Sequence, residues 1–255
     1  MFFFVKLNFR PSVERIRRSA IGEIIFQNML LNKKIRITIN NSQFSTFKID
    51  FNSYDICVLP NDTLVSCNLN SLTILDKDLN RIKNSRFNLL TGITVVTDTS
   101  ELFITDHLKN CIYVMDYNIN IVKTFGSLGS GTNQLNNPFN IHFHRNYLYI
   151  CDGGNNRIQI LNTDFEFIDT IPLDYRPYSI KVSDTKIGVC GSNGVYFYDI
   201  TTLALKEKYL NIIGRLSYIN SNFYVISCAP SKKGNSVFNK KKIFHLTLYL
   251  HRILL

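Results

Sequence analysis

A single pattern recurs four times along the middle of the chain and limits the fold more than any other feature. Each copy contains a short run, rich in β-branched and aromatic residues, that ends in Asp or Asn. These runs are Leu72–Asp76, Ile112–Asp116, Ile158–Asn162 and Val195–Asp199, and their last residues lie 40, 46 and 37 positions apart. A preceding run closes 9 or 10 residues before that last residue in all four copies. The chain is therefore an array of structural repeats.

Each repeat predicts four short β-strands. Its runs of Ile, Val, Tyr, Phe and Thr are bounded by Gly, Asn, Asp and Pro, a composition typical of strands and turns. A period of about 40–45 residues with four strands per unit indicates a β-propeller blade, whereas helical repeats would show a 3.6-residue pattern. The sequence thus predicts an all-β propeller.

Five four-stranded blades can be recognised, and a sixth is left open. The fifth blade is irregular: its first strands are predicted at Leu216–Ile219 and Phe223–Ile226. A basic insertion at about 231–242 delays its third strand to Ile243–Leu246. The number of blades in the closed ring is therefore five or six.

The chain divides into a basic N-terminal extension, residues 1–34, and the propeller, residues 35–255. Apolar residues near helical spacing from about Val13 to Leu31 predict that the extension is partly helical. Strands at 35–39 and 47–49 either begin a further blade or close the ring by pairing with the last one. Closure would remove exposed sheet edges.

The third repeat resembles the NHL repeat. Phe125–Pro138 begins with Phe-Gly, continues as a glycine-containing loop and ends with a proline before an innermost strand. The family's turn motif is then matched residue by residue at Asp152, Asn156, Arg157 and Ile158. The similarity extends over roughly residues 45–226 and implies an NHL-type β-propeller like that of the tripartite-motif NHL proteins. Those proteins also carry a RING finger, a B-box and a long coiled coil, whose patterns this sequence lacks.

We interpret the motif residues as structural. An Asp that closes a strand and an Asn four residues later can hydrogen-bond the backbone amides of a tight turn. Gly153 and Gly154 are expected to supply a positive φ there. A metal site in this turn is disfavoured because calcium takes about 6–8 oxygen ligands and the turn offers one carboxylate. The residues assigned to structural turns are Asp106, Asn110, Asp152, Asn156 and Arg157.

His142 and His144 are the only histidines close together, and strand alternation puts them on one face of the strand predicted to line the channel. NHL-like lyases that act on peptidylglycine hold a metal in such a channel, so the resemblance admits a metal-dependent lyase or hydrolase. A catalytic zinc usually has three protein ligands, whereas neighbouring first strands offer Thr94 and Lys181 at the position of His142. We therefore expect no cofactor and no enzyme activity, and keep the two histidines as weak metal candidates.

The net charge of +10 lies at the two ends of the chain. Residues 1–36 carry +6, residues 232–255 carry +6, and the body from 37 to 231 carries −2. Nucleic-acid affinity depends on Lys and Arg contacts to phosphates, and some NHL propellers bind RNA on a positively charged face. The near-neutral body weakens that expectation here. The lysines that could contact RNA or an acidic partner are Lys240, Lys241 and Lys242.

We predict a non-enzymatic interaction module that binds a protein partner through loops on one propeller face, where recognition residues concentrate. The resemblance adds a role as a substrate-recognition piece of a ubiquitin-ligase-type system. RNA binding by the same face or by the basic termini is the alternative, and no small-molecule substrate is indicated. The candidate binding residues are Tyr54, His107, Tyr147, Arg176 and Tyr178.

The remaining features favour a cytoplasmic protein without a membrane partner. The apolar start Met1–Val5 is interrupted by Lys6 and Arg10, unlike a signal peptide. No run approaches the roughly 18 apolar residues of a membrane span. The six cysteines form no CxxC pair and are expected to be buried free thiols.

Overall fold

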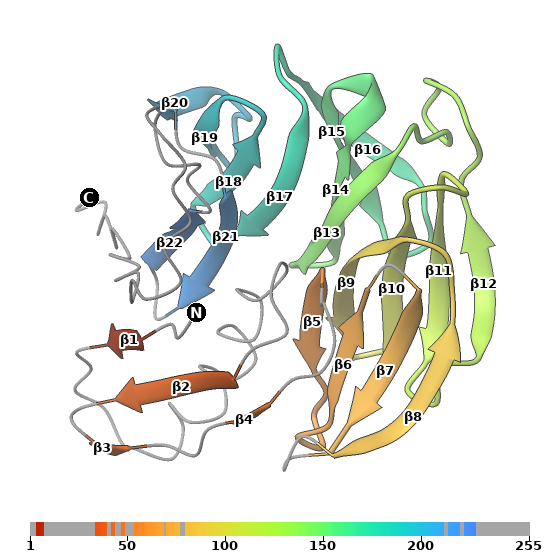
Figure 1. Cartoon of the computed structure of the whole chain (residues 1–255). Helices are drawn as coiled ribbons and strands as arrows, with labels where there is room; N and C mark the ends of the chain where they lie inside the picture. The colour runs from red at the N-terminus through yellow and green to blue at the C-terminus, as the bar shows by residue number, and fades with distance from the viewer. Residues whose placement is uncertain are drawn as a thin grey trace, which may run out of the picture.

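The computed structural model describes residues 4–7, 34–39, 42–43, 47–48, 54–68, 70–76, 80–211, 214–219 and 222–227. Four successive antiparallel sheets of four strands each dominate the described part of the chain (Figure 1). Within each sheet the strands are hydrogen-bonded in chain order. The prediction of an all-β propeller built from four-stranded blades is confirmed.

Each blade corresponds to one repeat. The first blade consists of β5 (Asp55–Val58), β6 (Leu64–Cys67), β7 (Ser71–Leu75) and β8 (Arg81–Arg86). The second consists of β9 (Leu90–Val96), β10 (Glu101–Asp106), β11 (Cys111–Asp116) and β12 (Ile121–Phe125). The third consists of β13 (Pro138–His144), β14 (Tyr147–Asp152), β15 (Arg157–Asn162) and β16 (Phe167–Pro172). The fourth consists of β17 (Pro177–Val182), β18 (Lys186–Gly191), β19 (Gly194–Asp199) and β20 (Leu205–Leu210).

The fifth predicted unit is described as two antiparallel strands, β21 (Gly214–Ile219) and β22 (Asn222–Ser227). Both lie where the sequence places its first two strands. The third strand predicted at 243–246 and the helix predicted between residues 13 and 31 lie outside the described residues.

The strands predicted near residues 35 and 47 are also present, in a sheet of a different kind. β1 (Phe4–Leu7) runs parallel to β2 (Lys34–Ile39). β2 also pairs antiparallel with β3 (Ser42–Gln43) and with β4 (Phe47–Lys48). The described blades contain antiparallel pairs, so the parallel pair sets this sheet apart from them.

Equivalent positions of the four repeats form a buried layer. The first residues of the recurring runs are fully buried: Leu72, Ile112, Ile158 and Val195. The residues paired with them on the second strands are equally buried: Cys67, Thr105, Cys151 and Cys190. Burial of each large apolar side chain contributes about 1.5–3 kcal/mol, so the repeat spacing positions the core.

The buried cysteines are packing groups. The five described cysteines form no disulfide, and burial raises the pKa of the Cys111 thiol to about 11. Burial also raises the pKa of Cys67 and of Cys151. These side chains therefore stay protonated at neutral pH and lack the thiolate that a nucleophile or metal ligand requires.

Side-chain hydrogen bonds join the innermost strands, which follow one another in the order β5, β9, β13, β17 and β21 (Figure 1). The buried Asp55 carboxylate accepts hydrogen bonds from Ile93 N at 3.0 Å and from Asn140 Nδ2 at 2.6 Å. Asn140 Oδ1 in turn accepts from Ile180 N at 3.1 Å. Two further bonds between inner strands are Phe143 N to Thr94 Oγ1 at 3.1 Å and Leu216 N to Ser179 Oγ at 3.2 Å.

The charge on Asp55 is opposed by burial and favoured by its surroundings. Burial raises the pKa of the Asp55 carboxyl, whereas Lys181, Arg215 and two backbone amides act to lower it. A buried carboxylate is tolerated only when it is paired and hydrogen-bonded. Asp55 accepts hydrogen bonds and lies near two cations, so the carboxylate that joins three blades is compatible with a buried position.

The outermost strand of every described blade carries the same irregularity. The pairing between third and fourth strands shifts register at four equivalent places: Ile74/Leu75, Val114/Met115, Ile160/Leu161 and Phe197/Tyr198. Such bulges increase the local twist of an edge strand and discourage it from pairing with another chain. The repeat thus protects its own exposed edges.

Gly92 occupies the position on β9 that pairs with Thr105, where the backbone of the next blade approaches closely. A Cβ atom on Gly92 would lie 2.7 Å from Asn140 Cα and 2.8 Å from Phe139 O. Overpacking of this kind costs about 1–3 kcal/mol. We therefore expect Gly92→Ala to lower the free energy of unfolding by about 2–3 kcal/mol in urea denaturation.

The matched control is Gly131→Ala in the loop before β13. A Cβ there would meet only the flexible side chain of Gln134, at 3.1 Å, so its effect should stay within about 0.5–1 kcal/mol. Equal effects of the two substitutions would contradict the assignment of Gly92 to a close approach between blades.

Candidate functional site

The ends of the blades form two faces with different connections. On one face, which we call the loop face, the loops between blades meet the turns between second and third strands. Backbone hydrogen bonds join each loop to such a turn, for example Gly154 N to Asn136 O at 2.7 Å and Leu173 N to Asn156 O at 2.8 Å. On the opposite face, the turn face, lie the turns between first and second and between third and fourth strands. The loops of the loop face are therefore held by backbone bonds.

Three of the predicted binding residues meet on the loop face around Phe139, near the start of β13. The ring of His107 lies 4.6 Å from that of Phe139, and the ring of Tyr178 contacts it edge-on at 5.0 Å. The Arg176 guanidinium lies over the Phe139 ring at 5.0 Å, a cation–π geometry. The four side chains come from three segments: the turn after β10, the start of β13, and the loop before β17 together with the start of that strand.

His107 is neutral in this cluster. Its Nδ1 lies 3.2 Å from the carbonyl oxygen of Pro138, so this nitrogen carries the proton and donates it. Partial burial lowers the pKa of His107, and the positive charge of Arg176 lowers it further. The ring therefore offers Nε2 as a hydrogen-bond acceptor beside the Arg176 cation.

The other two candidates lie elsewhere. Tyr54 precedes β5 on the loop face, where the Arg215 guanidinium lies 5.8 Å from its ring centroid. Tyr147 begins β14, directly after the hairpin that joins it to β13 on the turn face. The structure therefore groups His107, Arg176 and Tyr178 and separates Tyr147 from them.

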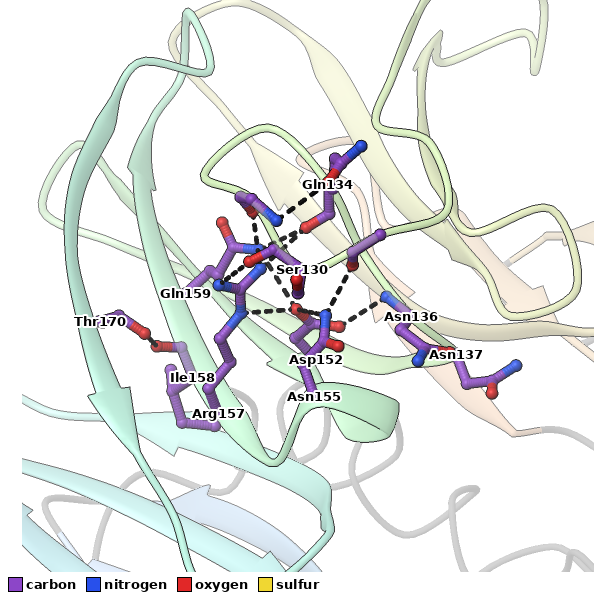
Figure 2. Close-up of polar contacts among 12 residues, drawn as sticks. Ser130, Gln134, Asn136, Asn137, Asp152, Asn155, Arg157, Ile158, Gln159 and Thr170 are labelled. Carbon is purple, nitrogen blue, oxygen red and sulfur yellow. Dashed lines mark hydrogen bonds and ion pairs between the residues drawn. The ribbon is translucent and has the colours of Figure 1, made fainter.

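The motif residue Arg157 holds the long loop between the second and third blades. Its Nε donates to Asp152 Oδ2 at 2.7 Å, and its terminal nitrogens donate to the carbonyls of Ser130, Gly131 and Gln134 at 2.7 to 3.0 Å (Figure 2). Asp152 is fully buried. One arginine thus joins a buried carboxylate to three carbonyls of the loop, which fixes the loop face beside the Phe139 cluster.

The Asp152 carboxylate has a wider role than the sequence suggested. Its Oδ1 accepts from Asn136 N at 2.7 Å, which lies in the preceding loop and not in its own turn. Its Oδ2 also accepts from Asn155 Nδ2 and Gln159 Nε2 (Figure 2). Asn156 contributes a left-handed backbone, with φ of 50°.

In the second blade Asp106 bonds its own turn, whereas Asn110 reaches the following loop. Asp106 Oδ1 accepts from Leu108 N at 3.1 Å and from Lys109 N at 2.8 Å. Asn110 also adopts a positive φ, of 57°, and its Oδ1 accepts from Asn137 N at 2.7 Å in the loop before the third blade. Without an arginine at position 111, Asp106 caps its own turn.

The expectation of a positive φ at Gly153 and Gly154 is wrong. Among the described glycines, only Gly126 and Gly129 have φ in the left-handed region. The two residues are glycines because of close approach: a Cβ on Gly153 would lie 2.6 Å from the Phe139 ring, and one on Gly154 would lie 2.4 Å from Asn136 Cγ. Gly153 therefore leaves room for the central ring of the cluster.

His142 and His144 lie on the first strand of the third blade, β13, as the sequence predicted. Burial lowers the pKa of His142 well below its usual value, and Lys181 lowers it further. His144 Nε2 lies 3.2 Å from Asp184 Oδ1. Among the described residues, no three His, Cys, Asp or Glu side chains are grouped so that they could hold a metal ion.

Sequence reasoning missed Phe139. Phe139 is the second residue of the innermost strand β13, and its half-buried ring is the centre of the cluster. The available signal was the phenylalanine directly after Pro138, opposite Gly153. The other predicted contacts, Lys240, Lys241 and Lys242, lie outside the described residues.

No protein-family model and no curated protein matches the chain. Solved structures do match. An inactive variant of virginiamycin B lyase from Staphylococcus aureus with quinupristin has 12% identity and a TM-score of 0.56, over 74% of this chain and 69% of that one. The WD40 domain of Neurospora crassa Pan2 has 12% identity and a TM-score of 0.55, over 73% and 63%. Hydrazine synthase of Kuenenia stuttgartiensis has 18% identity and a TM-score of 0.54, over 65% and 52%, so the chain spans about half of it.

The chain folds as a β-propeller. At these identities the likeness shows the fold alone, and the resemblance to the NHL family stays a prediction. Within the described part of the propeller, no helix has the length and apolar character needed to cross a membrane.

Removing the Arg157 guanidinium should free the loop. Arg157→Met leaves the buried Asp152 carboxylate without its cation, which costs about 3–5 kcal/mol for a buried pair. We expect a loss of this order in chemical denaturation. We also expect faster amide hydrogen exchange at Gly131 and Gln134, whose N–H groups are hydrogen-bonded within the loop that Arg157 holds.

Arg145→Met is the matched control. Arg145 pairs with Asp184 on the turn face, and both side chains are largely exposed, so its loss should change stability by less than about 1 kcal/mol. Slow exchange in the loop of Arg157→Met would contradict the proposed anchoring.

Elemental analysis tests the histidine pair. Because Lys181 lies near His142 and disfavours a second cation there, we expect purified protein to hold zinc well below one equivalent per chain after dialysis against trace zinc. One tightly held zinc that disappears in His142→Ala would overturn this expectation.

Proposed function

We propose that the chain is a non-enzymatic interaction module that binds a protein partner on its loop face. The observation that carries the proposal is the Phe139 cluster, in which two aromatic rings, an imidazole and a guanidinium meet on anchored loops. Aromatic and arginine side chains dominate the binding energy of protein interfaces. Loops on a rigid scaffold are also where recognition residues concentrate.

Two exposed leucines extend this surface. Leu108 is 58% exposed in the turn after His107, and Leu128 is 64% exposed in the loop that Arg157 anchors. Asn137, at the end of that loop, donates its side-chain nitrogen to His107 O at 3.3 Å, so turn and loop are adjacent. The loop face therefore combines apolar, aromatic and cationic groups, as the centres of protein interfaces do.

The proposal also covers the location of the protein and the kind of system in which it acts. We place the protein in the cytoplasm, which the five described cysteines support because they form no disulfide, as is usual in reducing compartments. A role in substrate recognition for a ubiquitin-ligase-type system is the version of the proposal that depends on the resemblance to tripartite-motif NHL proteins. RNA binding is the alternative outcome of the test below.

Site-specific photocrosslinking distinguishes the two faces. Benzoylphenylalanine replaces Leu108 on the loop face or, as the control, Tyr147 on the turn face, and the full-length chain is irradiated in its native cells. We expect one defined protein adduct from position 108 and none of that mass from position 147, because only the loop face carries the cluster.

Equal adducts from both positions would contradict a specific loop-face interface. If nuclease digestion shortens the adduct, the partner is RNA and not a protein.

A further inference from the structure

The Arg176 guanidinium is held in place, but its N–H groups donate no hydrogen bond to the described residues. Its backbone is fixed by Ser192, whose N donates to Arg176 O at 2.9 Å and whose Oγ accepts from Arg176 N at 3.4 Å. The guanidinium lies over the Phe139 ring. Within the described residues, neither terminal nitrogen donates a hydrogen bond, and buried Nε also has no partner. The group is therefore positioned by packing and leaves its terminal donors for another molecule.

The charged side chains near Arg176 interact with other groups. Asp106 caps its own turn and accepts from Tyr113 OH at 3.3 Å, and Lys109 Nζ donates to Tyr113 OH at 2.8 Å. Asp174 precedes Arg176 by two residues, and its charge acts on Tyr196 and Tyr198. No ion pair joins a described carboxylate to Arg176.

The two faces differ in charge. The described turns of the turn face carry one basic side chain, Arg145, against acidic side chains in every one of the four complete blades: Asp62, Asp76, Asp98, Asp116, Asp164, Glu166, Asp184 and Asp199. The described loops and turns of the loop face carry Lys109 and Arg176 against a single exposed acid, Asp174. The charge of the body is thus distributed so that an anionic group is attracted to one face and repelled from the other.

We propose that the loop face binds an acidic peptide segment, whose carboxylate pairs with Arg176 and whose adjacent apolar side chain packs near Leu108 and Leu128. This inference rests on the proposed protein-binding function and names the chemistry of its partner. Arginine presents a planar fork that matches a carboxylate, and such paired hydrogen bonds are among the stronger polar contacts. Stacking on Phe139 keeps the fork oriented, which reduces the entropy lost on binding.

A protein carboxylate fits this surface better than a nucleic acid. Nucleic-acid affinity grows with the number of phosphates that Lys and Arg neutralise, whereas the cluster offers one unpaired guanidinium. The acidic turns of the opposite face also oppose the approach of a polyanion. Neutral His107 adds an acceptor beside Arg176, suited to a backbone N–H of a peptide.

Peptide titration followed by NMR tests the inference with the full-length chain. The probe is acetyl-Gly-Leu-Glu-Glu-Leu-Gly-amide, and the matched probe has Gln in place of both Glu. We expect saturable shifts of the arginine Nε–H signal that Arg176→Gln removes, with the Gln peptide binding at least about tenfold more weakly, as expected for loss of a charge-assisted pair.

Three variants complete the design. Arg176→Gln should weaken binding of the Glu peptide about tenfold or more, and Arg176→Lys should fall between because it keeps the charge without the fork. Arg145→Gln on the turn face should bind as the wild type does. Thermal unfolding midpoints of all variants show whether each one is folded.

Equal binding of the Glu and Gln peptides, or unchanged binding by folded Arg176→Gln, would overturn the inference. So would binding of a ten-nucleotide oligouridine that depends on Arg176 and excludes the peptide. If the protein adduct at position 108 persists in Arg176→Gln, the proposed contact between Arg176 and a carboxylate is wrong. The proposed protein-binding function would still hold.

Discussion

Hydrogen bonds between the innermost strands hold the blades to one another, and the rest of the structure depends on them. The Asp55 carboxylate joins the first blade to the second through Ile93 and to the third through Asn140, and Asn140 passes the connection to Ile180 in the fourth. Successive blades share no sheet, so side chains must supply the bonds that strands supply within a blade. Because these groups are buried, each bond also avoids the cost of an unpaired polar atom.

The loop face follows from this arrangement. Once inner strands approach as closely as Gly92 allows, the start of β13 lies beside the turn after β10 and the segment leading into β17. Phe139 then contacts side chains from both neighbours. The Arg157 pair with buried Asp152 fixes the intervening loop, so the candidate site is built at a junction of three blades.

Much of the fold could be read from the chain because the repeat has a constant internal spacing. Strand propensity and turn residues placed the second and third strands of four blades, and the buried run beginning at Leu72 has an equivalent in each. The role of Asp152 could not be read in this way. Its partners Asn136 and Arg157 lie on either side of it in the chain, and local turn chemistry cannot reveal a bond to a loop of the preceding blade.

The sequence by itself determined the repeat, the strand order within a blade and the location of most positive charge at the chain ends, since these depend on local spacing and composition. Only the tertiary structure decided which candidate residues meet. Tyr147 and Tyr178 are equally plausible binding residues from the sequence, yet they lie at opposite ends of the antiparallel strands and therefore on opposite faces. The same alternation places the acidic turns on one face and half-buried Arg176, stacked on Phe139, on the other.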